Sequence, residues 1–124
     1  MEYAHDHTGS TIAITTRLSG PRLAEISEYV AETSGPNGSS VCFEGFEGSF
    51  PKFSVRGTGN PETDLRFHVA IANLGRGSTG HIEIDSSPAV PASVADCYAA
   101  YFRFMERLGD IVRLEDPAAQ VLVD

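Results

Sequence analysis

Residues 93–108, SVADCYAAYFRFMERL, constrain the fold most, because they form the longest uninterrupted helical pattern in the chain. Apolar side chains recur there at steps of one helical turn, at Val94, Cys97, Tyr98, Tyr101, Met105 and Leu108. Phe102 and Phe104 widen this stripe beyond what one sheet face covers. We therefore expect a core helix that is buried on more than one side, by a sheet together with loops or a second chain.

The residues that flank this helix predict its ends. Pro91 is expected to stop any earlier helix, and Ser93 followed by Asp96 resembles a capping box with a short acid. Gly109 is expected to end the helix. The apolar residues within 111–114 and 121–123 then predict a short final strand or a packed tail.

The first part of the chain predicts one strand followed by one helix. Residues 11–18 alternate between apolar and polar side chains, which is typical of a half-buried strand. Ser19, Gly20 and Pro21 then open a helix, with proline at its favoured early position. The buried stripe of this helix is expected at Leu23, Ile26, Val30 and Thr33.

Four later segments again alternate between apolar and polar residues, as strands require. They are residues 41–44, 50–56, 65–73 and 82–84. The last two are expected to pair as a hairpin whose register is fixed by parity, because a slip of one residue would bury charges. One such register places Ile71 opposite Ile82, Val69 opposite Ile84, Ala70 opposite Glu83, and His68 opposite Asp85.

This order of elements predicts an α+β fold, with an antiparallel sheet of about five strands and two helices on one face. One helix follows the first strand and the other lies near the C-terminus. The 124 residues are enough to bury a core, and we expect a single domain at residues 11–124. The polar residues 1–10 predict a flexible arm.

The chain is acidic, since 17 acidic and 9 basic residues give a formal charge of -8. This charge repels phosphate backbones and anionic lipids, so we expect a basic protein partner and neither a nucleic acid nor a membrane. The candidate partner-binding residues are Glu25, Glu28, Glu32, Glu44 and Glu47. For the first three, a merely solvated helix face is the alternative interpretation.

Residues 1–10 lack the basic end and apolar run of a secretory signal, and the sequence has no apolar run of the roughly eighteen residues that a membrane span needs. We therefore expect a cytoplasmic protein. His5 and His7 have a spacing that suits a transition metal, but no closed set of ligands accompanies them. We expect no metal site and no cofactor.

Residues 75–80 match the pattern G-x-G-x-x-G directly after a strand, which is also a pattern of nucleotide-binding loops. A nucleotide site needs a helix N-terminus after the loop, whereas residues 81–85 predict a strand. We therefore interpret these glycines as a hairpin loop.

The outer face of the same hairpin gathers polar side chains, at Arg66, His68, His81, Glu83 and Asp85. A histidine beside an aspartate is the pairing that a general base uses. A solvated sheet face explains these residues equally, because polar positions alternate with apolar ones on any sheet that is buried on one side. No nucleophile accompanies the pair, so catalysis is not the preferred interpretation.

The chain resembles small bacterial immunity proteins of polymorphic toxin systems, particularly the WapI-type and related uncharacterised actinobacterial families. The resemblance rests on the layout of four features: the Gly20-x-x-Leu23 helix entry, FEGFEGSF at 43–50, the strand LRFHVAIA at 65–72, and the terminal aromatic helix. It implies a non-enzymatic inhibitor that binds a toxin and covers its active site. The acidic charge would then steer the inhibitor onto a basic cleft.

Two other hypotheses stay open. The first is a homo-oligomeric structural or accessory domain, in which the wide aromatic helix seals against a second copy. The second is a small enzyme that uses His68 and Asp85, which requires a concave pocket beside those residues.

Overall fold

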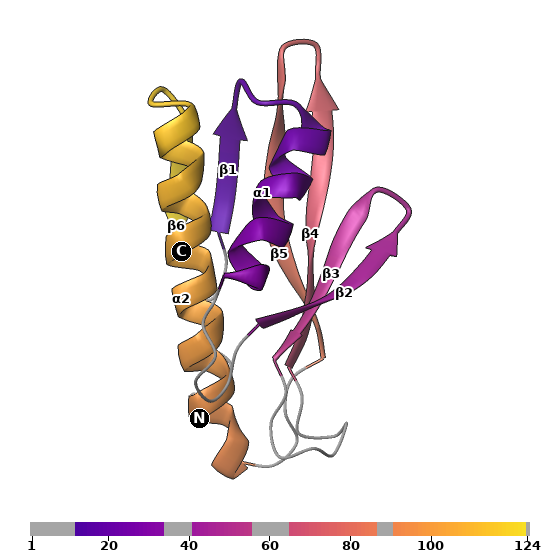
Figure 1. The fold of residues 1–124 in the computed structure, drawn as a ribbon, viewed down its shortest axis with the longest axis vertical. Helices are drawn as coiled ribbons and strands as arrows, with labels where there is room; N and C mark the ends of the chain where they lie inside the picture. Colours follow the sequence, from indigo (N-terminus) through magenta and orange to yellow (C-terminus); the bar gives the residue numbers. More distant parts are fainter. Residues whose placement is uncertain (1–11, 34–40, 56–64, 87–90, 124) are drawn as a thin grey trace, which may run out of the picture.

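The computed structural model describes residues 12–33, 41–55, 65–86 and 91–123, and within the last range it describes side chains from residue 99 onward. The elements are β1 (Ile12–Thr16), α1 (Gly20–Glu32), β2 (Val41–Glu47), β3 (Phe50–Val55), β4 (Leu65–Leu74), β5 (Gly77–Ser86), α2 (Pro91–Glu115) and β6 (Gln120–Val123) (Figure 1). The arm predicted at residues 1–10 lies outside the described residues.

The six strands form one sheet in the order β2-β3-β4-β5-β1-β6, and every neighbouring pair is antiparallel. Both helices lie on one face of it, in front of the sheet in Figure 1. The predicted α+β class, with an antiparallel sheet and two helices, is therefore confirmed. The sheet has six strands rather than about five, because residues 120–123 pair with β1 as a final edge strand.

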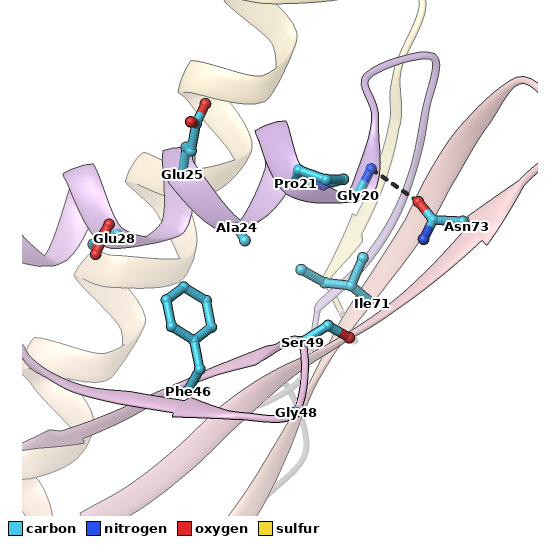
Figure 2. Close-up of a pocket in the computed structure, with 10 residues that line it drawn as sticks. All are labelled: Gly20, Pro21, Ala24, Glu25, Glu28, Phe46, Gly48, Ser49, Ile71 and Asn73. Atoms are coloured by element: carbon cyan, nitrogen blue, oxygen red, sulfur yellow. Dashed lines mark hydrogen bonds between the residues drawn. The ribbon is translucent and has the colours of Figure 1, made fainter.

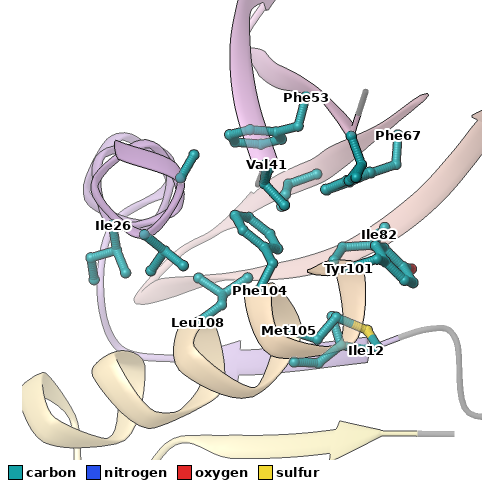
Figure 3. Close-up of a cluster of buried hydrophobic side chains, with 14 of the residues drawn as sticks. Ile12, Ile26, Val41, Phe53, Phe67, Ile82, Tyr101, Phe104, Met105 and Leu108 are labelled. Carbon is teal, nitrogen blue, oxygen red and sulfur yellow. The ribbon is translucent and has the colours of Figure 1, made fainter. Parts of the chain in front are cut away.

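Four aromatic side chains hold α2 against the sheet (Figure 3). The Phe104 ring lies 5.1 Å from that of Phe53 and 5.3 Å from that of Phe67, between ring centroids. Tyr101 meets Phe67 edge-on at 4.9 Å. All four side chains are fully buried, and α1 adds Leu23, Ile26 and Val30 to the same core. Leu23, Ile26 and Val30 confirm the predicted stripe of α1, and the buried Tyr101, Phe104, Met105 and Leu108 confirm that of α2 from residue 99 onward. Phe102 is 41% exposed rather than part of that stripe, and the predicted members Val94, Cys97 and Tyr98 lie outside the described side chains.

The predicted ends of α2 were wrong at both sides. The helix begins at Pro91, because proline is tolerated in a first turn, where its missing N–H has no helical partner to lose. It continues through Gly109 to Glu115, so residues 111–114 are helical. Gly109 marks a close approach rather than a stop, since a Cβ there would lie 3.1 Å from Cγ1 of Val121 in β6.

The register predicted for the β4–β5 hairpin is shifted by two residues in the structure. Val69 lies opposite Ile82, Ile71 opposite Gly80, and Ala70 opposite His81, while His68 lies opposite Glu83 rather than Asp85. The predicted parity holds, because apolar residues of both strands still share the helix-facing side. The turn sets the shift: Gly75 and Arg76 form a two-residue connection that the apolar pattern alone does not specify.

Gly77 confirms that the glycine pattern at residues 75–80 belongs to a hairpin. Its φ is +104°, and a Cβ there would lie 2.1 Å from the backbone oxygen of Thr16 in β1. Ser78, the next residue, donates a hydrogen bond to the Leu18 carbonyl over 2.8 Å. The glycine thus allows β5 to lie directly against the end of β1.

The carboxylate of Asp116 joins the end of α2 to the end of β1. It accepts hydrogen bonds from the Arg17 backbone N–H at 2.8 Å, from the Thr16 hydroxyl at 2.7 Å and from the Ala118 N–H at 3.2 Å. These donors, with the Arg17 N–H as the main cause, hold the pKa of Asp116 below its usual value. The same turn starts β6 beside β1.

Replacing Phe104 by alanine is expected to lower the free energy of unfolding by about 3 to 5 kcal/mol, because it leaves a cavity beside the buried rings of Phe53 and Phe67. Chemical denaturation of the two proteins measures this difference. Phe102→Ala is the matched control, because Phe102 lies on the same helix with 41% of its surface exposed. A loss for Phe104→Ala no larger than that of the control would contradict the central role of the aromatic cluster.

Gly77→Ala is expected to lower the free energy of unfolding by at least about 1 kcal/mol, because alanine is strained at a positive φ and its Cβ would strike β1. Gly75→Ala should change stability by no more than about 0.5 kcal/mol, because open space surrounds that position. Thermal or chemical denaturation compares the two variants. Equal effects would show that the turn, rather than the contact with β1, determines the cost.

Candidate partner-binding site

The exposed side of α1 carries three of the predicted partner-binding residues, Glu25, Glu28 and Glu32. We call these three residues the acidic face. The opposite side of the helix is buried through Leu23, Ile26 and Val30, as its spacing predicts, whereas Thr33 is exposed at the helix end. Tyr29 also lies on the solvent side, with 53% of its surface exposed. An exposed aromatic ring among carboxylates is more typical of a contact surface than of a purely solvated helix.

A hollow of about 380 Å³ lies between α1, the β2–β3 turn and β4 (Figure 2). We call it the turn hollow. Ala24, Phe46 and Ile71 supply its apolar walls, and Glu25 and Glu28 border it. Figure 2 shows the Phe46 ring extending from its strand towards α1. The combination of apolar walls with carboxylates at the edge suits an apolar group that carries a neighbouring positive charge.

Two local features create the turn hollow. The N-terminus of α1 is held on β4, because the Gly20 N–H donates to Oδ1 of Asn73 at 3.1 Å. The β2–β3 pair has a register shift between Phe43 and Gly45, which is a β-bulge, and bulges bend the strand that carries them. Phe46 follows this bulge and remains 54% exposed instead of joining the core.

A second hollow, of about 370 Å³, lies on the other side of α1, between α1 and the C-terminal part of α2. We call it the helix hollow. Ile26, Tyr29, Ile111 and Leu114 supply its apolar walls. Leu114 is 79% exposed, which is unusual for a leucine beside another apolar surface.

Arg22 and Glu115 border the helix hollow and form an ion pair between the two helices. Arg22 Nε donates to Glu115 Oε1 at 2.8 Å, and Arg22 Nη1 lies 3.2 Å from Glu25 Oε1. Glu115 and Glu25 raise the pKa of Arg22, and the guanidinium lowers the pKa of Glu115. The positive charges of Arg22 and of Arg107, which donates to the Thr33 carbonyl at the end of α1, face four carboxylates, those of Glu115 and the acidic face. This side of the molecule is therefore negative.

Glu44 and Glu47, the other two predicted partner-binding residues, belong to a different surface. Glu44 accepts a hydrogen bond from the Ser54 hydroxyl, and Glu47 Oε1 lies 3.4 Å from Lys52 Nζ. Along β3, Ser54 and Lys52 alternate with Phe53 and Val55, which face the helices. The structure therefore does not bring the five glutamates together, and of these five only Glu25 and Glu28 line a hollow.

The predicted polar sheet face is a compact set of charged contacts. Nδ1 of His68 lies 3.0 Å from both carboxylate oxygens of Asp85, and Nε2 lies 3.2 Å from Glu83 Oε1. His81 Nε2 lies 2.8 Å from Glu83 Oε2, and Arg66 lies two residues before His68 on β4. The two-residue register shift does not separate His68 from Asp85, because a diagonal neighbour across a strand pair stays within reach of long side chains.

This arrangement is poorly suited to general base catalysis. Both ring nitrogens of His68 face carboxylates, so neither is directed at a substrate. The ring also stacks on Phe50, with 5.8 Å between centroids and 7° between planes, which leaves 15% of the His68 side chain exposed. The turn and helix hollows are lined by other residues. The carboxylates and the Phe50 ring together hold the His68 side chain in place.

The described residues contain no group of three or more His, Cys, Asp or Glu side chains that is placed to hold a metal ion. His5 and His7 lie outside that part of the chain. Among the same residues, no helix combines the length and apolar character that crossing a membrane requires.

Comparison with known proteins gives little beyond these observations. No protein-family model matches the chain, and a search of curated proteins finds no match. The crystal structure of Ara h 8.0201 is similar to this chain at 12% sequence identity, covering 82% of this chain and 96% of that one, with a TM-score of 0.40. A likeness at this level carries no argument about function.

The apolar walls of both hollows were missed by sequence reasoning. Phe46 stands where the alternation of β2 breaks, and Tyr29 falls outside the buried stripe of α1, so both positions carry a weak signal in the sequence. Ala24 and Leu114 carry no such signal, because the walls that they form depend on how α1 packs against the sheet and against α2.

Replacing His81 by alanine is expected to raise the pKa of Glu83. The carboxyl pKa is lowered chiefly by the hydrogen bond from His81, and further by the charge of His68. A lowered folded-state pKa adds stability above the usual glutamate value of about 4.3, and that stability is lost as the pH falls through the folded-state pKa. Carbon-13 NMR of the Glu83 carboxyl measures the shift.

The control for this experiment is Thr79→Ala, on the same face of β5. It should leave the Glu83 titration unchanged. An unchanged Glu83 titration in His81→Ala would show that the hydrogen bond does not persist in solution.

Proposed function

We propose that this chain is a non-enzymatic acidic binding protein that docks a basic protein through the acidic face of α1. The observation that carries this proposal is the position of Glu25 and Glu28 between two apolar hollows, with Glu32 further along the same side of α1. Carboxylates in the middle of the surface attract a basic partner, and the apolar hollows on either side of them supply anchoring sites.

The charge of the whole chain supports the same proposal. A formal charge of -8 draws a positively charged partner towards the protein before contact and raises the association rate. The resemblance to immunity proteins of toxin systems gives this partner a class, which is a toxin with a basic active-site cleft. In this role the chain inhibits its cognate toxin by binding it directly and covering the cleft.

A second candidate function, a homo-oligomeric accessory domain, is favoured by a different observation. Phe102, Leu122 and Val123 are 41%, 68% and 58% exposed on α2 and on the edge strand β6. Phe102 and Val123 border one shallow hollow between these elements. A second copy docked there would cover apolar area, and sedimentation showing a monomer at all concentrations would remove this candidate.

The enzyme hypothesis is the weakest of the three. It depends on a pocket beside His68 and Asp85 and on a free ring nitrogen. The His68 ring is instead engaged by carboxylates at both nitrogens and covered by Phe50.

Reversing the charge of the acidic face, by Glu25→Lys, Glu28→Lys and Glu32→Lys together, is expected to slow association with the partner by about tenfold or more at low salt. The partner is recovered from the native host at low salt, with the product of the neighbouring gene present, and biolayer interferometry then measures the association rate. The same rate should fall with added salt in the unmodified protein.

The matched control reverses Glu106 and Asp110, which are exposed acids on α2, and is compared with the double reversal Glu25→Lys and Glu28→Lys, so that both variants change the net charge by four. It makes a comparable change in net charge away from the acidic face and should slow association less. Equal slowing by both variants would mean that only net charge matters, and recovery of no partner at low salt would count against the proposed function.

A further inference from the structure

We infer that the partner crosses α1 as an extended basic segment, placing one large apolar side chain in the turn hollow, a second in the helix hollow, and a lysine or arginine over the acidic face between them. This inference rests on the proposed function and specifies the partner's chemistry. It follows from the arrangement of the two hollows about one helix.

The two hollows lie on opposite flanks of the exposed side of α1. Successive residues of an α-helix are rotated by roughly 100°. Ala24, in the turn hollow, and Ile26, in the helix hollow, therefore lie about 100° to either side of Glu25. Glu32, seven residues after Glu25, returns to nearly the same direction, so carboxylates separate the two hollows.

The width of α1 sets the spacing of the two anchors. A helix with its side chains is about 10 to 12 Å across, so side chains that enter hollows on either flank must be roughly 10 Å apart. A chain in the extended polyproline II conformation advances about 3.1 Å per residue and returns to the same side every three residues. Two anchors that are three residues apart therefore both face α1 and lie roughly 9 Å apart. The segment therefore has the pattern apolar-x-x-apolar, with a basic residue at one or both central positions.

The chemistry of each hollow selects what can occupy it. Both are walled by apolar side chains, including the exposed aromatic rings of Phe46 and Tyr29, and each has room for one aromatic or branched side chain. Between them, Arg22 is already paired with Glu115 and Glu25, so it does not neutralise Glu28 or Glu32. A basic residue gains from these carboxylates, whereas an acidic one is repelled.

The test uses the full chain, labelled for NMR, and two synthetic probes. The first probe is acetyl-Phe-Lys-Arg-Leu-amide, and the second is acetyl-Phe-Glu-Asp-Leu-amide, which keeps the anchors and reverses the charge. We expect the basic peptide to shift the signals of Ala24 and Ile71 and also those of Ile111 and Leu114. The acidic peptide should bind at least tenfold more weakly.

Two variants test the turn hollow directly. Ala24→Leu fills it and should weaken binding of the basic peptide by about tenfold, whereas Ala99→Leu adds the same side chain at an exposed position of α2 and should not. Phe46→Ala removes a wall without adding volume and tests the hollow if Ala24→Leu fails to fold. Thermal melts confirm that each variant is folded.

Several results would overturn the inference: shifts confined to one hollow, shifts centred on His68, equal binding of both peptides, or no saturable shift. These outcomes differ from failure of the proposed function. Peptide binding at both hollows without inhibition of any toxin would contradict the immunity role alone. Toxin inhibition without shifts at the hollows would contradict this docking geometry alone.

Discussion

The packing of Phe53, Phe67, Tyr101 and Phe104 between α2 and the sheet is the interaction on which the rest of the structure depends. Burying four aromatic rings in mutual contact supplies a large apolar area and a specific geometry. Because these rings fill the space between helix and sheet, the hollows that we describe lie at the margins of α1. The core thus places the proposed binding surface at the outside of the helical layer.

Much of the fold is predictable from the sequence, because the spacing of apolar residues within each segment indicates whether it is a helix or a strand. The alternation in β4 and the helical spacing in α1 and α2 depend only on neighbouring residues, and they are confirmed. The errors have longer-range causes. Gly109 looks like a helix end, yet it lies inside α2, where Val121 of β6 packs close to it. The β4–β5 register depends on the length of the turn at Gly75, which parity does not determine.

The candidate site is less predictable, because it also depends on contacts between segments that are far apart in the chain. Glutamate positions can be read directly, but which of them share a surface depends on the tertiary fold. Glu25 and Glu28 border an apolar hollow, whereas Glu44 and Glu47 contact Ser54 and Lys52. The walls of the hollows come from segments far apart in the chain, such as Ala24, Phe46 and Ile71. No local sequence pattern predicts such a combination.

The sheet can finish forming only when β1, the first described strand, pairs with β6, the last one. Ile12 of β1 lies opposite Val123 of β6, and Asp116 bonds to Thr16 and Arg17 across about a hundred residues. Contacts so distant in sequence close a long loop and slow folding. On the ribosome, β1 therefore keeps an unpaired edge until residues 120–123 emerge. An unpaired strand edge can pair with other chains, so the nascent chain is open to aggregation during that interval.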